Sequence, residues 1–291
     1  MEEYRHNFER NGFCIIRGAI NQDIIKNANL VIDEFLAKHK HMLLKEGLLA
    51  DGLLQRVVNF HHCITPLKNV FVEAMESSSE VTDKFGRATL YTSLFFELGS
   101  QQPLHRDTPY FFSGSQSGYM GVWAALDDVD DTNGPLVVVK GSHKLGEPNL
   151  EKLKMKYHPN EPVPPSSSEL FNAYNEELVS FANSAGLETV VCEVSKGDVI
   201  VWDPATLHGG LPHLNKEKTR RSFVMHVTPK NMPIKHMDYF FNPNKPIGET
   251  NKDYENYSGR LIEVGDKVDF MHKKIMPVEL LGRFDNKGEK N

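Results

Sequence analysis

The sequence contains few cysteines: Cys14, Cys63 and Cys192 are the only three in 291 residues. Because they are odd in number and widely separated, they argue against a disulfide framework and favour a reducing compartment, the cytoplasm. No segment approaches the run of about 18 apolar residues that a membrane-spanning helix needs. The first residues, Met1 to Arg10, are charged and lack the apolar segment of a signal peptide. We therefore expect a cytoplasmic protein with no membrane partner.

The chain also has no excess of positive charge. It carries 33 Lys and Arg against 39 Asp and Glu, a net charge of −6 with a pI near 6.1, so we expect no nucleic-acid partner. Hydrophobic residues make up 40% and charged residues 25%, which is typical of a soluble globular protein. No internal repeat or linker is visible. We expect a single domain over residues 1–291, present as a monomer or a homodimer and acting on a small molecule.

Short β-rich runs separated by turn residues dominate from residue 88 onward. They predict strands near 89–97, 104–107, 119–127, 135–139, 188–194, 198–202 and 220–228, with an earlier strand at 13–16 and helices over 22–39 and 67–84. This pattern favours a sandwich or barrel over alternating β and α units. An insertion at 144–187 combines a Pro- and Ser-rich loop (159–168) with an amphipathic helix, and it is a candidate lid. Residues 232–257 are expected to wrap irregularly.

The pattern His105-Arg106-Asp107, with His208 far along the chain, indicates a metal site. Side chains at positions i and i+2 of an extended strand point to the same face. Two histidines and one carboxylate form the facial triad that holds Fe(II) and leaves positions open for a cosubstrate and O2. Gly209 and Gly210 follow the second histidine and allow the backbone to approach a ligand closely.

An arginine near His208 suits a dicarboxylic cosubstrate, because its planar guanidinium pairs with a carboxylate through two hydrogen bonds. Along 220–228, Arg220 shares a polar face with Ser222 and His226, which we assign to the cosubstrate cavity. The opposite, apolar face, which starts with Arg221, is assigned to packing against the helices. A slip of one residue would exchange Arg220 for Arg221, so both arginines remain candidates.

Several segments together resemble the phytanoyl-CoA dioxygenase-like (PhyH-like) family of Fe(II)/2-oxoglutarate oxygenases. The similarity is carried by Phe8–Ala19 (FERNGFCIIRGA), Leu104–Asp107 (LHRD), Gly121–His143 (GVWAALDDVDDTNGPLVVVKGSH), Gly197–Gly209 (GDVIVWDPATLHG) and Arg220-Arg221-Ser222. They occur in the family's order over almost the whole chain. One departure is Gly210, where many relatives have Ser or Thr, and the spacing to the arginine is about one residue longer.

The resemblance implies a double-stranded β-helix (jelly-roll, cupin-like) core that is mainly β, with helices buttressing one sheet. It implies that His105, Asp107 and His208 bind Fe(II), that Arg220 holds the distal carboxylate of 2-oxoglutarate, and that Trp123 packs near this cosubstrate. It also implies an O2-dependent dioxygenase that converts 2-oxoglutarate to succinate and CO2 and hydroxylates a small metabolite. A carboxylate at Asp107 argues against the related halogenases, which have a small residue there.

Two alternatives remain open. The same cofactors also support desaturation, epoxidation or ring chemistry, and a non-catalytic jelly-roll relative would bind a ligand only. For the remaining site residues, simple packing competes with a role at the cavity. We assign Tyr91 and Ser93 to the cosubstrate site, and the substrate site to Gln102, Tyr110, Phe111, Asn59 and His61. The sequence His61-His62-Cys63 invites a metal site, but no second cluster is expected to complete it.

Overall fold

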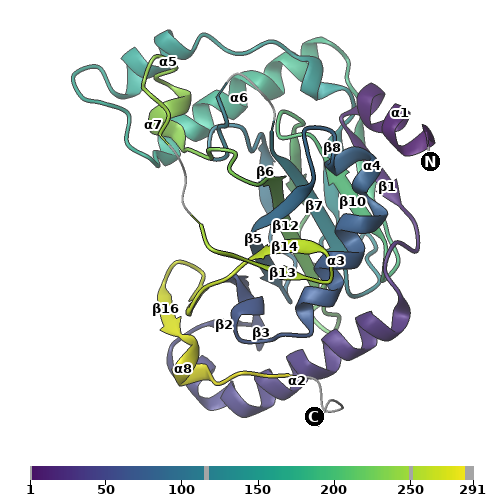
Figure 1. Cartoon of the computed structure of the whole chain (residues 1–291). Coiled ribbons are helices and arrows are strands. Elements are labelled where there is room, and N and C mark those ends of the chain that lie inside the picture. Colours follow the sequence, from purple (N-terminus) through teal and green to yellow (C-terminus); the bar gives the residue numbers. More distant parts are fainter. Residues whose placement is uncertain (1, 115–117, 249–251, 286–291) are drawn as a thin grey trace.

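Two mainly antiparallel sheets and a layer of helices build the molecule, which is a computed structural model describing residues 2–114, 118–248 and 252–285 (Figure 1). The strands of the main sheet follow the order β1-β10-β7-β12-β5-β4-β15-β16, and a hairpin of β13 and β14 joins it through β5. Their bounds are β1 Phe13–Ile16, β4 Arg56–Val58, β5 Ala88–Phe96, β7 Met120–Ala125, β10 Val199–Trp202, β12 Ser222–Pro229, β13 Tyr254–Tyr257, β14 Arg260–Glu263, β15 Lys267–Phe270 and β16 Lys274–Pro277.

The smaller sheet has the order β6-β11-β8-β9. Its strands are β6 Gln102–His105, β8 Leu136–Val139, β9 Thr189–Cys192 and β11 His208–Gly210, and a separate short hairpin joins β2 Leu49–Ala50 to β3 Leu53–Leu54. A buried cluster that includes Trp123, Val138, Ile200 and Trp202 combines side chains of the two sheets. The inner faces of the two sheets therefore enclose one apolar core, as in a jelly roll.

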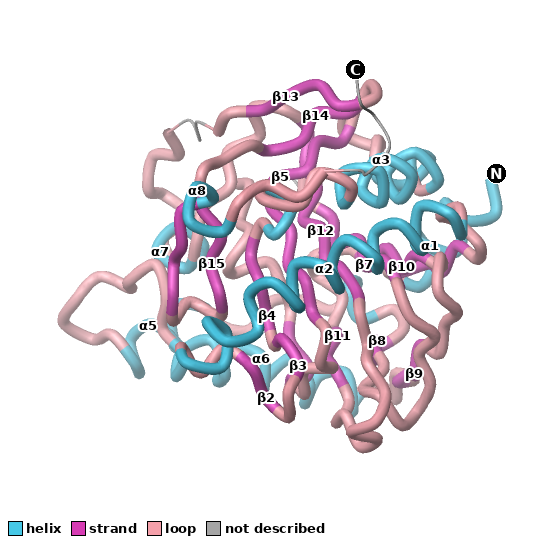
Figure 2. The backbone as a smooth tube through the Cα atoms, turned by 90° about the horizontal axis from the view of Figure 1, so that it is seen from below, coloured by secondary structure: helices cyan, strands magenta, loops and turns pink. Residues whose placement is uncertain are grey.

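Helices of the N-terminal part cover the outer face of the main sheet (Figure 2). Asn21 caps the long helix α2 by accepting a hydrogen bond from the backbone N–H of Asp23. Ile25, Ile32 and Phe35 recur at helical spacing and are buried in the core on this side. These helical elements are α1 Glu2–Asn11, α2 Gln22–Lys45, η1 Phe60–His62, α3 Leu67–Ser77 and α4 Ser79–Thr82, and α8 Val278–Leu281 packs near α2.

A second helical group gathers at the end of the molecule away from α2 (Figure 1). It consists of α5 Leu150–Tyr157, α6 Ser168–Ser184 and α7 Met237–Phe240, and the short η2 (Ser142–Lys144) precedes it. Leu170, Tyr174 and Leu178 of α6 form its apolar core with Phe240 and Phe241. The insertion predicted at 144–187 is thus an ordered helical unit that packs next to β6.

All the strands predicted between 89 and 228 are present, with ends that shift by up to two residues. The prediction of irregular wrapping over 232–257 is wrong in part, because this segment contains α7 and β13. The strands β13 to β16 and the short β11 escaped prediction, since each has at most four residues and little apolar alternation.

Candidate active site

The structure brings His105, Asp107 and His208 together at one end of the smaller sheet. His105 ends β6, His208 begins β11, and the two residues are register partners. Their Nε2 atoms lie 3.9 and 3.7 Å from Oδ1 of Asp107, and the candidate ligand atoms of all three lie within 4.8 Å of one another. Among the described residues no fourth His, Cys, Asp or Glu joins this group, as expected for a facial triad.

Hydrogen bonds orient both imidazole rings. Nδ1 of His105 donates to the carbonyl of Pro103 at 2.8 Å, and Nδ1 of His208 donates to the carbonyl of Thr206 at 3.0 Å. Each ring therefore presents the lone pair of Nε2 toward Asp107. Burial lowers the pKa of His208 to about 4, which keeps this ring neutral and able to bind a metal near pH 7.

The Asp107 carboxylate is fixed through one oxygen only. Its Oδ2 accepts hydrogen bonds from the hydroxyl of Tyr119 at 2.9 Å and from Nε1 of Trp202 at 3.0 Å, so Oδ1 is free for a metal. Burial by itself would raise the pKa of Asp107, but nearby His208 and other polar neighbours lower it below its usual value. The donor set is therefore two imidazole nitrogens and one carboxylate oxygen, which fits Fe(II).

Tyr119 and Trp202 were not predicted to contact Asp107. The hydroxyl of Tyr119 also makes a short hydrogen bond to Nδ1 of His226. Trp202 lies flat against Gly121, where an added Cβ would come within 2.1 Å of the indole. A buried tryptophan needs a hydrogen-bond acceptor for its N–H. The position of Trp202 in an apolar strand could therefore have indicated that its indole contacts a polar group of the site.

Arg220 is a buried cation without an acidic partner among the described residues. Its Nη1 donates to the carbonyl of Gly134 at 3.0 Å, while Nε has no hydrogen-bond partner. The guanidinium lies over the rings of Phe96 and Trp123, at 5.6 and 5.7 Å from their centroids. Burial lowers the pKa of Arg220 to about 10, because an unpaired charge is costly away from water. This environment suits an anionic group.

Gly210 departs from the family pattern for a local reason. A Cβ at this position would lie 2.3 Å from the backbone oxygen of Ser100, so a serine or threonine does not fit without moving the chain. The close approach occurs where β11 meets β6 in an irregular register: His208 faces His105, while Gly210 faces Gln102. One extra residue on β6 bulges out, so Gln102 points to the same face as His105.

Tyr110 and Phe111, which were assigned to the substrate site, follow Asp107 closely in the chain, and their backbone N–H groups donate to its carbonyl. The ring of Phe111 stacks on His226 and Tyr119, with centroid distances of 4.2 and 4.5 Å. The ring of Tyr110 packs on that of Phe171 of α6, with 4.7 Å between their centroids. The centroid of the Phe171 ring in turn lies 6.0 Å from that of His105. The insertion therefore supplies an aromatic side chain next to the metal ligands.

Ser93 and His61 must be reassigned, because both lie on the helix side of the main sheet. Ser93 is the register partner of Met225, whose side chain belongs to the core under the helices. The Ser93 hydroxyl contacts Nδ1 of His61 at 3.0 Å, and His61 packs edge-on against Phe71 of α3. A sheet separates them from the triad, so we withdraw them from the cosubstrate and substrate sites.

Tyr91 and Asn59 also have structural surroundings. Lys252 lies over the Tyr91 ring at 4.3 Å; burial, followed by Tyr254 and Glu263, raises the pKa of Tyr91 to about 12. Tyr91 thus belongs with the β13–β14 hairpin. The side-chain oxygen of Asn59 accepts hydrogen bonds from the Thr92 hydroxyl and the Ser93 N–H, which ties η1 to β5. Neither residue contacts the triad.

The prediction that nothing completes the His61-His62 pair is wrong, because Glu263 of β14 joins them in a second group of metal-ligand type. Hydrogen bonds already engage all four ring nitrogens, however. His61 contacts Ser93 and the Glu263 carbonyl, and His62 contacts the Lys267 carbonyl and the Glu263 carboxylate. Two of these nitrogens donate to carbonyls, so the group is a structural network that joins η1 to the C-terminal strands.

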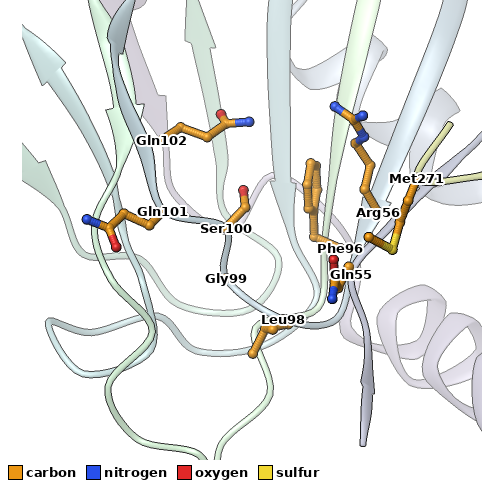
Figure 3. A pocket seen from close by; sticks show the side chains of 9 residues that line it. All are labelled: Gln55, Arg56, Phe96, Leu98, Gly99, Ser100, Gln101, Gln102 and Met271. Carbon is orange, nitrogen blue, oxygen red and sulfur yellow. The ribbon is translucent and has the colours of Figure 1, made fainter. Parts of the chain in front are cut away.

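A pocket of about 400 Å³ is lined by Phe96, the residue whose ring lies under the guanidinium of Arg220. Figure 3 shows the side chains around this pocket. Gln102 of β6 and Arg56 of β4 extend from opposite sides of it, with Phe96 of β5 beside Arg56 (Figure 3). Sequence reasoning assigned Gln102 to the substrate site but did not single out Phe96. The other lining residues are Gln55, Leu98, Gly99, Ser100, Gln101 and Met271.

A model of the phytanoyl-CoA dioxygenase (PhyH) family matches residues 8–222, and the chain belongs to this family. Mouse peroxisomal phytanoyl-CoA dioxygenase is 25% identical over 166 residues, which cover 49% of this chain and 47% of the mouse protein. The match thus spans about half the length of that relative. The family and the fold are those of non-haem iron, 2-oxoglutarate-dependent enzymes, which confirms the predicted family and jelly-roll class.

Solved structures share this fold at low identity. AviO1 from Streptomyces viridochromogenes Tue57 aligns with a TM-score of 0.55 at 20% identity, over 80% of this chain and 97% of its own. The 2-oxoglutarate-dependent epimerase SnoN from nogalamycin biosynthesis aligns with a TM-score of 0.56 at 14% identity, over 90% of this chain and 97% of its own. EctD from S. alaskensis, solved with 2-oxoglutarate and 5-hydroxyectoine, aligns with a TM-score of 0.54 at 16% identity, over 81% of this chain and 78% of its own. In residues 2–114, 118–248 and 252–285 we find no helix long and apolar enough to cross a bilayer.

Proposed function

We propose that the protein is an Fe(II)- and 2-oxoglutarate-dependent dioxygenase that hydroxylates a small organic metabolite. The observation that carries the proposal is the pairing of a preorganised triad with an unpaired, buried Arg220. When bound, iron with O2 supplies the oxidising chemistry, and 2-oxoglutarate is decarboxylated to succinate and CO2. The side chains provide binding, orientation and exclusion of water.

His105, Asp107 and His208 would hold the metal through Nε2, Oδ1 and Nε2. Tyr119 and Trp202 hold the other oxygen of Asp107, so the carboxylate cannot rotate away from the metal. Arg220 would bind the distal carboxylate of 2-oxoglutarate, with Trp123 against the guanidinium. Phe111, Tyr110 and Phe171 give this region an aromatic wall that suits an organic substrate.

The test is to add Fe(II) and then 2-oxoglutarate without O2 and to record the visible charge-transfer band of a chelated 2-oxo acid. We expect the band in the native protein and its loss in His105→Ala. Admitting O2 should then release succinate. A folded native protein that shows neither the band nor succinate would favour a ligand-binding protein without catalysis.

Hydroxylation is the outcome we favour, and product analysis separates it from desaturation, epoxidation or ring chemistry. The fold supports such alternatives, since SnoK and SnoN are described as a carbocyclase and an epimerase. Asp107 supports an oxygenase over a halogenase, because its carboxylate fills the position at which a halide would bind. We further propose that the chain acts as one catalytic domain over residues 1–291, with 144–187 as the segment that closes over the substrate.

A further inference from the structure

Arg56 reaches the same interior as the triad, although it precedes the predicted strands. In the main sheet Arg56 is the register partner of Phe96, and Phe96 is the partner of Ser222. Register partners in neighbouring strands point to one face. Phe96 faces inward, because its ring lies under the guanidinium of Arg220. Arg56 therefore lies on the inner face, two strands from β12 and at the rim of the 400 Å³ pocket.

The Arg56 guanidinium has no hydrogen-bond or ion-pair partner within the described parts of the chain. Its pKa is lowered by burial, and Asp269 opposes this effect through its charge. Asp269 makes no hydrogen bond to Arg56 in this structure, and its two oxygens accept hydrogen bonds from His272. A half-buried guanidinium without a partner at a pocket favours an incoming anion.

The rest of the pocket limits the kind of anion. Arg56 is the only charged residue among the described residues that line it, and Gln55, Gln102 and Ser100 add neutral hydrogen-bonding groups. One cation and neutral donors match a singly charged carboxylate better than a phosphate dianion. Phe96, Leu98 and Met271 supply apolar surface for a hydrocarbon part. A volume of about 400 Å³ is typical of a small-molecule site.

This pocket is distinct from the place expected for the distal carboxylate of 2-oxoglutarate. Arg220 is buried between Phe96 and Trp123 and does not line the pocket, whereas Arg56 is half-buried and lines it. The backbone of β4, which carries Arg56, lies two strand spacings, roughly 10 Å, from β12, which Arg220 precedes. Gln102, on the face shared with His105, lies across the pocket from Arg56 (Figure 3). A ligand held between Arg56 and Gln102 thus extends toward the metal ligands.

We propose that the substrate is an amphiphilic monocarboxylic acid, whose carboxylate pairs with Arg56 and accepts a hydrogen bond from Gln102. This inference rests on the oxygenase function proposed above, since it names the class of substrate for that site. The apolar part of the acid contacts Phe96, Leu98 and Met271. The carboxylate is the anchor, and the reacting carbon lies on the part directed toward the triad.

The test compares acids with their uncharged amides. Octanoate, 3-phenylpropanoate and the corresponding primary amides are titrated into protein loaded with Mn(II) and 2-oxoglutarate without O2, by calorimetry and tryptophan fluorescence. Both of the chain's tryptophans, Trp123 and Trp202, lie at the site, so the emission reports on it. We expect at least one acid to bind about 10- to 100-fold more tightly than its amide, which is the range of a charge-assisted hydrogen-bonded pair.

Variants assign this difference to Arg56. Arg56→Gln should weaken the binding of the acid by a similar factor and leave the affinities for the amide and for 2-oxoglutarate unchanged. Arg56→Lys should recover part of the affinity for the acid. Arg5→Gln, which removes an exposed charge on α1, should change nothing. The acid–amide comparison on the native protein stands even if one Arg56 variant fails to fold.

Three results would overturn the inference: acids and amides that bind alike, no binding of any acid at millimolar concentration, or a loss of 2-oxoglutarate affinity in Arg56→Gln as large as in Arg220→Gln. The two proposals fail in different ways. Acid-selective binding that depends on Arg56, in a protein that releases no succinate with O2, would leave the pocket assigned and reject the oxygenase function.

Discussion

Arg220 and Arg221 are adjacent in the chain, yet their guanidinium groups lie on opposite sides of the main sheet. Arg220 points inward and lies over Trp123 and Phe96, with only the Gly134 carbonyl as a hydrogen-bond acceptor. Arg221 points toward α2 and pairs with Glu97 at 2.8 Å and Asp33 at 2.6 Å. The first guanidinium remains available for a ligand, whereas the second is already neutralised by protein carboxylates.

This difference predicts opposite effects for two similar substitutions. Arg220→Ala should raise the 2-oxoglutarate concentration needed for half-maximal succinate release by about tenfold or more, because a charge-assisted contact is lost. Arg221→Ala should leave that requirement nearly unchanged but lower the free energy of unfolding by about 3–5 kcal/mol, since Glu97 is left buried and unpaired. Titration of 2-oxoglutarate and urea denaturation of both variants provide the measurements, and a reversed order would refute the assigned register.

Asp107→Ala should abolish turnover, because the metal would lose its only anionic protein ligand. The same variant should lose the visible band that forms with Fe(II) and 2-oxoglutarate. Asp131→Ala, which alters an exposed aspartate, serves as the control and should behave as the native protein does. Hydroxylation retained in Asp107→Ala would remove Asp107 from the ligand set.

Tyr119→Phe should weaken metal binding by about tenfold or more, since groups that orient a ligand carboxylate commonly contribute 10- to 100-fold in affinity. The substitution removes the hydrogen bond to Oδ2 of Asp107 and leaves the aromatic stack with Phe111 in place. Tyr110→Phe is a matched control, because its hydroxyl contacts only Ser166. Titration with Co(II), followed by its absorption spectrum, should separate the two variants, and equal affinities would contradict a positioning role.

The loop 159–168 should matter more for substrate than for cosubstrate. Its ends already meet, because Nε2 of His158 contacts the Ser167 hydroxyl at 3.0 Å, so a shorter connection is feasible. Replacing residues 160–165 with two glycines should reduce substrate-coupled succinate release and leave the 2-oxoglutarate requirement unchanged. Buried Val163 is lost in this variant, so thermal denaturation must confirm folding. Unchanged coupling in a folded variant would mean that the loop is no lid.

His61 should make the protein less stable in mild acid. Burial, with a smaller effect of His62, lowers the pKa of His61 from 6.5 to about 3. Below pH 6.5 His61 is therefore protonated in the unfolded chain but stays neutral in the folded one. The free energy of unfolding then falls by up to about 1.4 kcal/mol per pH unit. This loss continues until the pH approaches 3.

The measurement is urea denaturation of the metal-free protein between pH 7 and pH 5. His61→Gln should reduce the slope of this pH dependence by up to about 1.4 kcal/mol per pH unit, while His208, whose pKa is also lowered by burial, keeps the rest. His6→Gln, at an exposed position of α1, should retain the native slope. A slope that is the same in His61→Gln and in the native protein would show that His61 does not carry this dependence.

The sequence alone determined the features that depend on short-range geometry. The i and i+2 spacing predicts that His105 and Asp107 lie together, and the alternation predicted along 220–228 separates Arg220 from Arg221, because side chains of an extended chain alternate between faces. The structure keeps both relationships although Asp107 lies just after β6 and the two arginines just before β12. The apolar period of α2 likewise predicts which side of that helix is buried. The pattern also offered His208, followed by Gly209 and Gly210, as the distant second histidine, and the family resemblance implies the same ligand.

Only the tertiary structure decided which neighbours face the site, because register and bulges depend on partners far away in the chain. In β5, Thr92 and Leu90 pair with His226 and Val227, so Tyr91 bulges out, and the strand turns Ser93 toward the helices. Packing also brings Tyr119 and Trp202 onto Asp107 and sets Arg56 opposite Gln102. The sequence of a single strand does not predict such contacts, since each is formed with a distant segment that the local pattern does not specify.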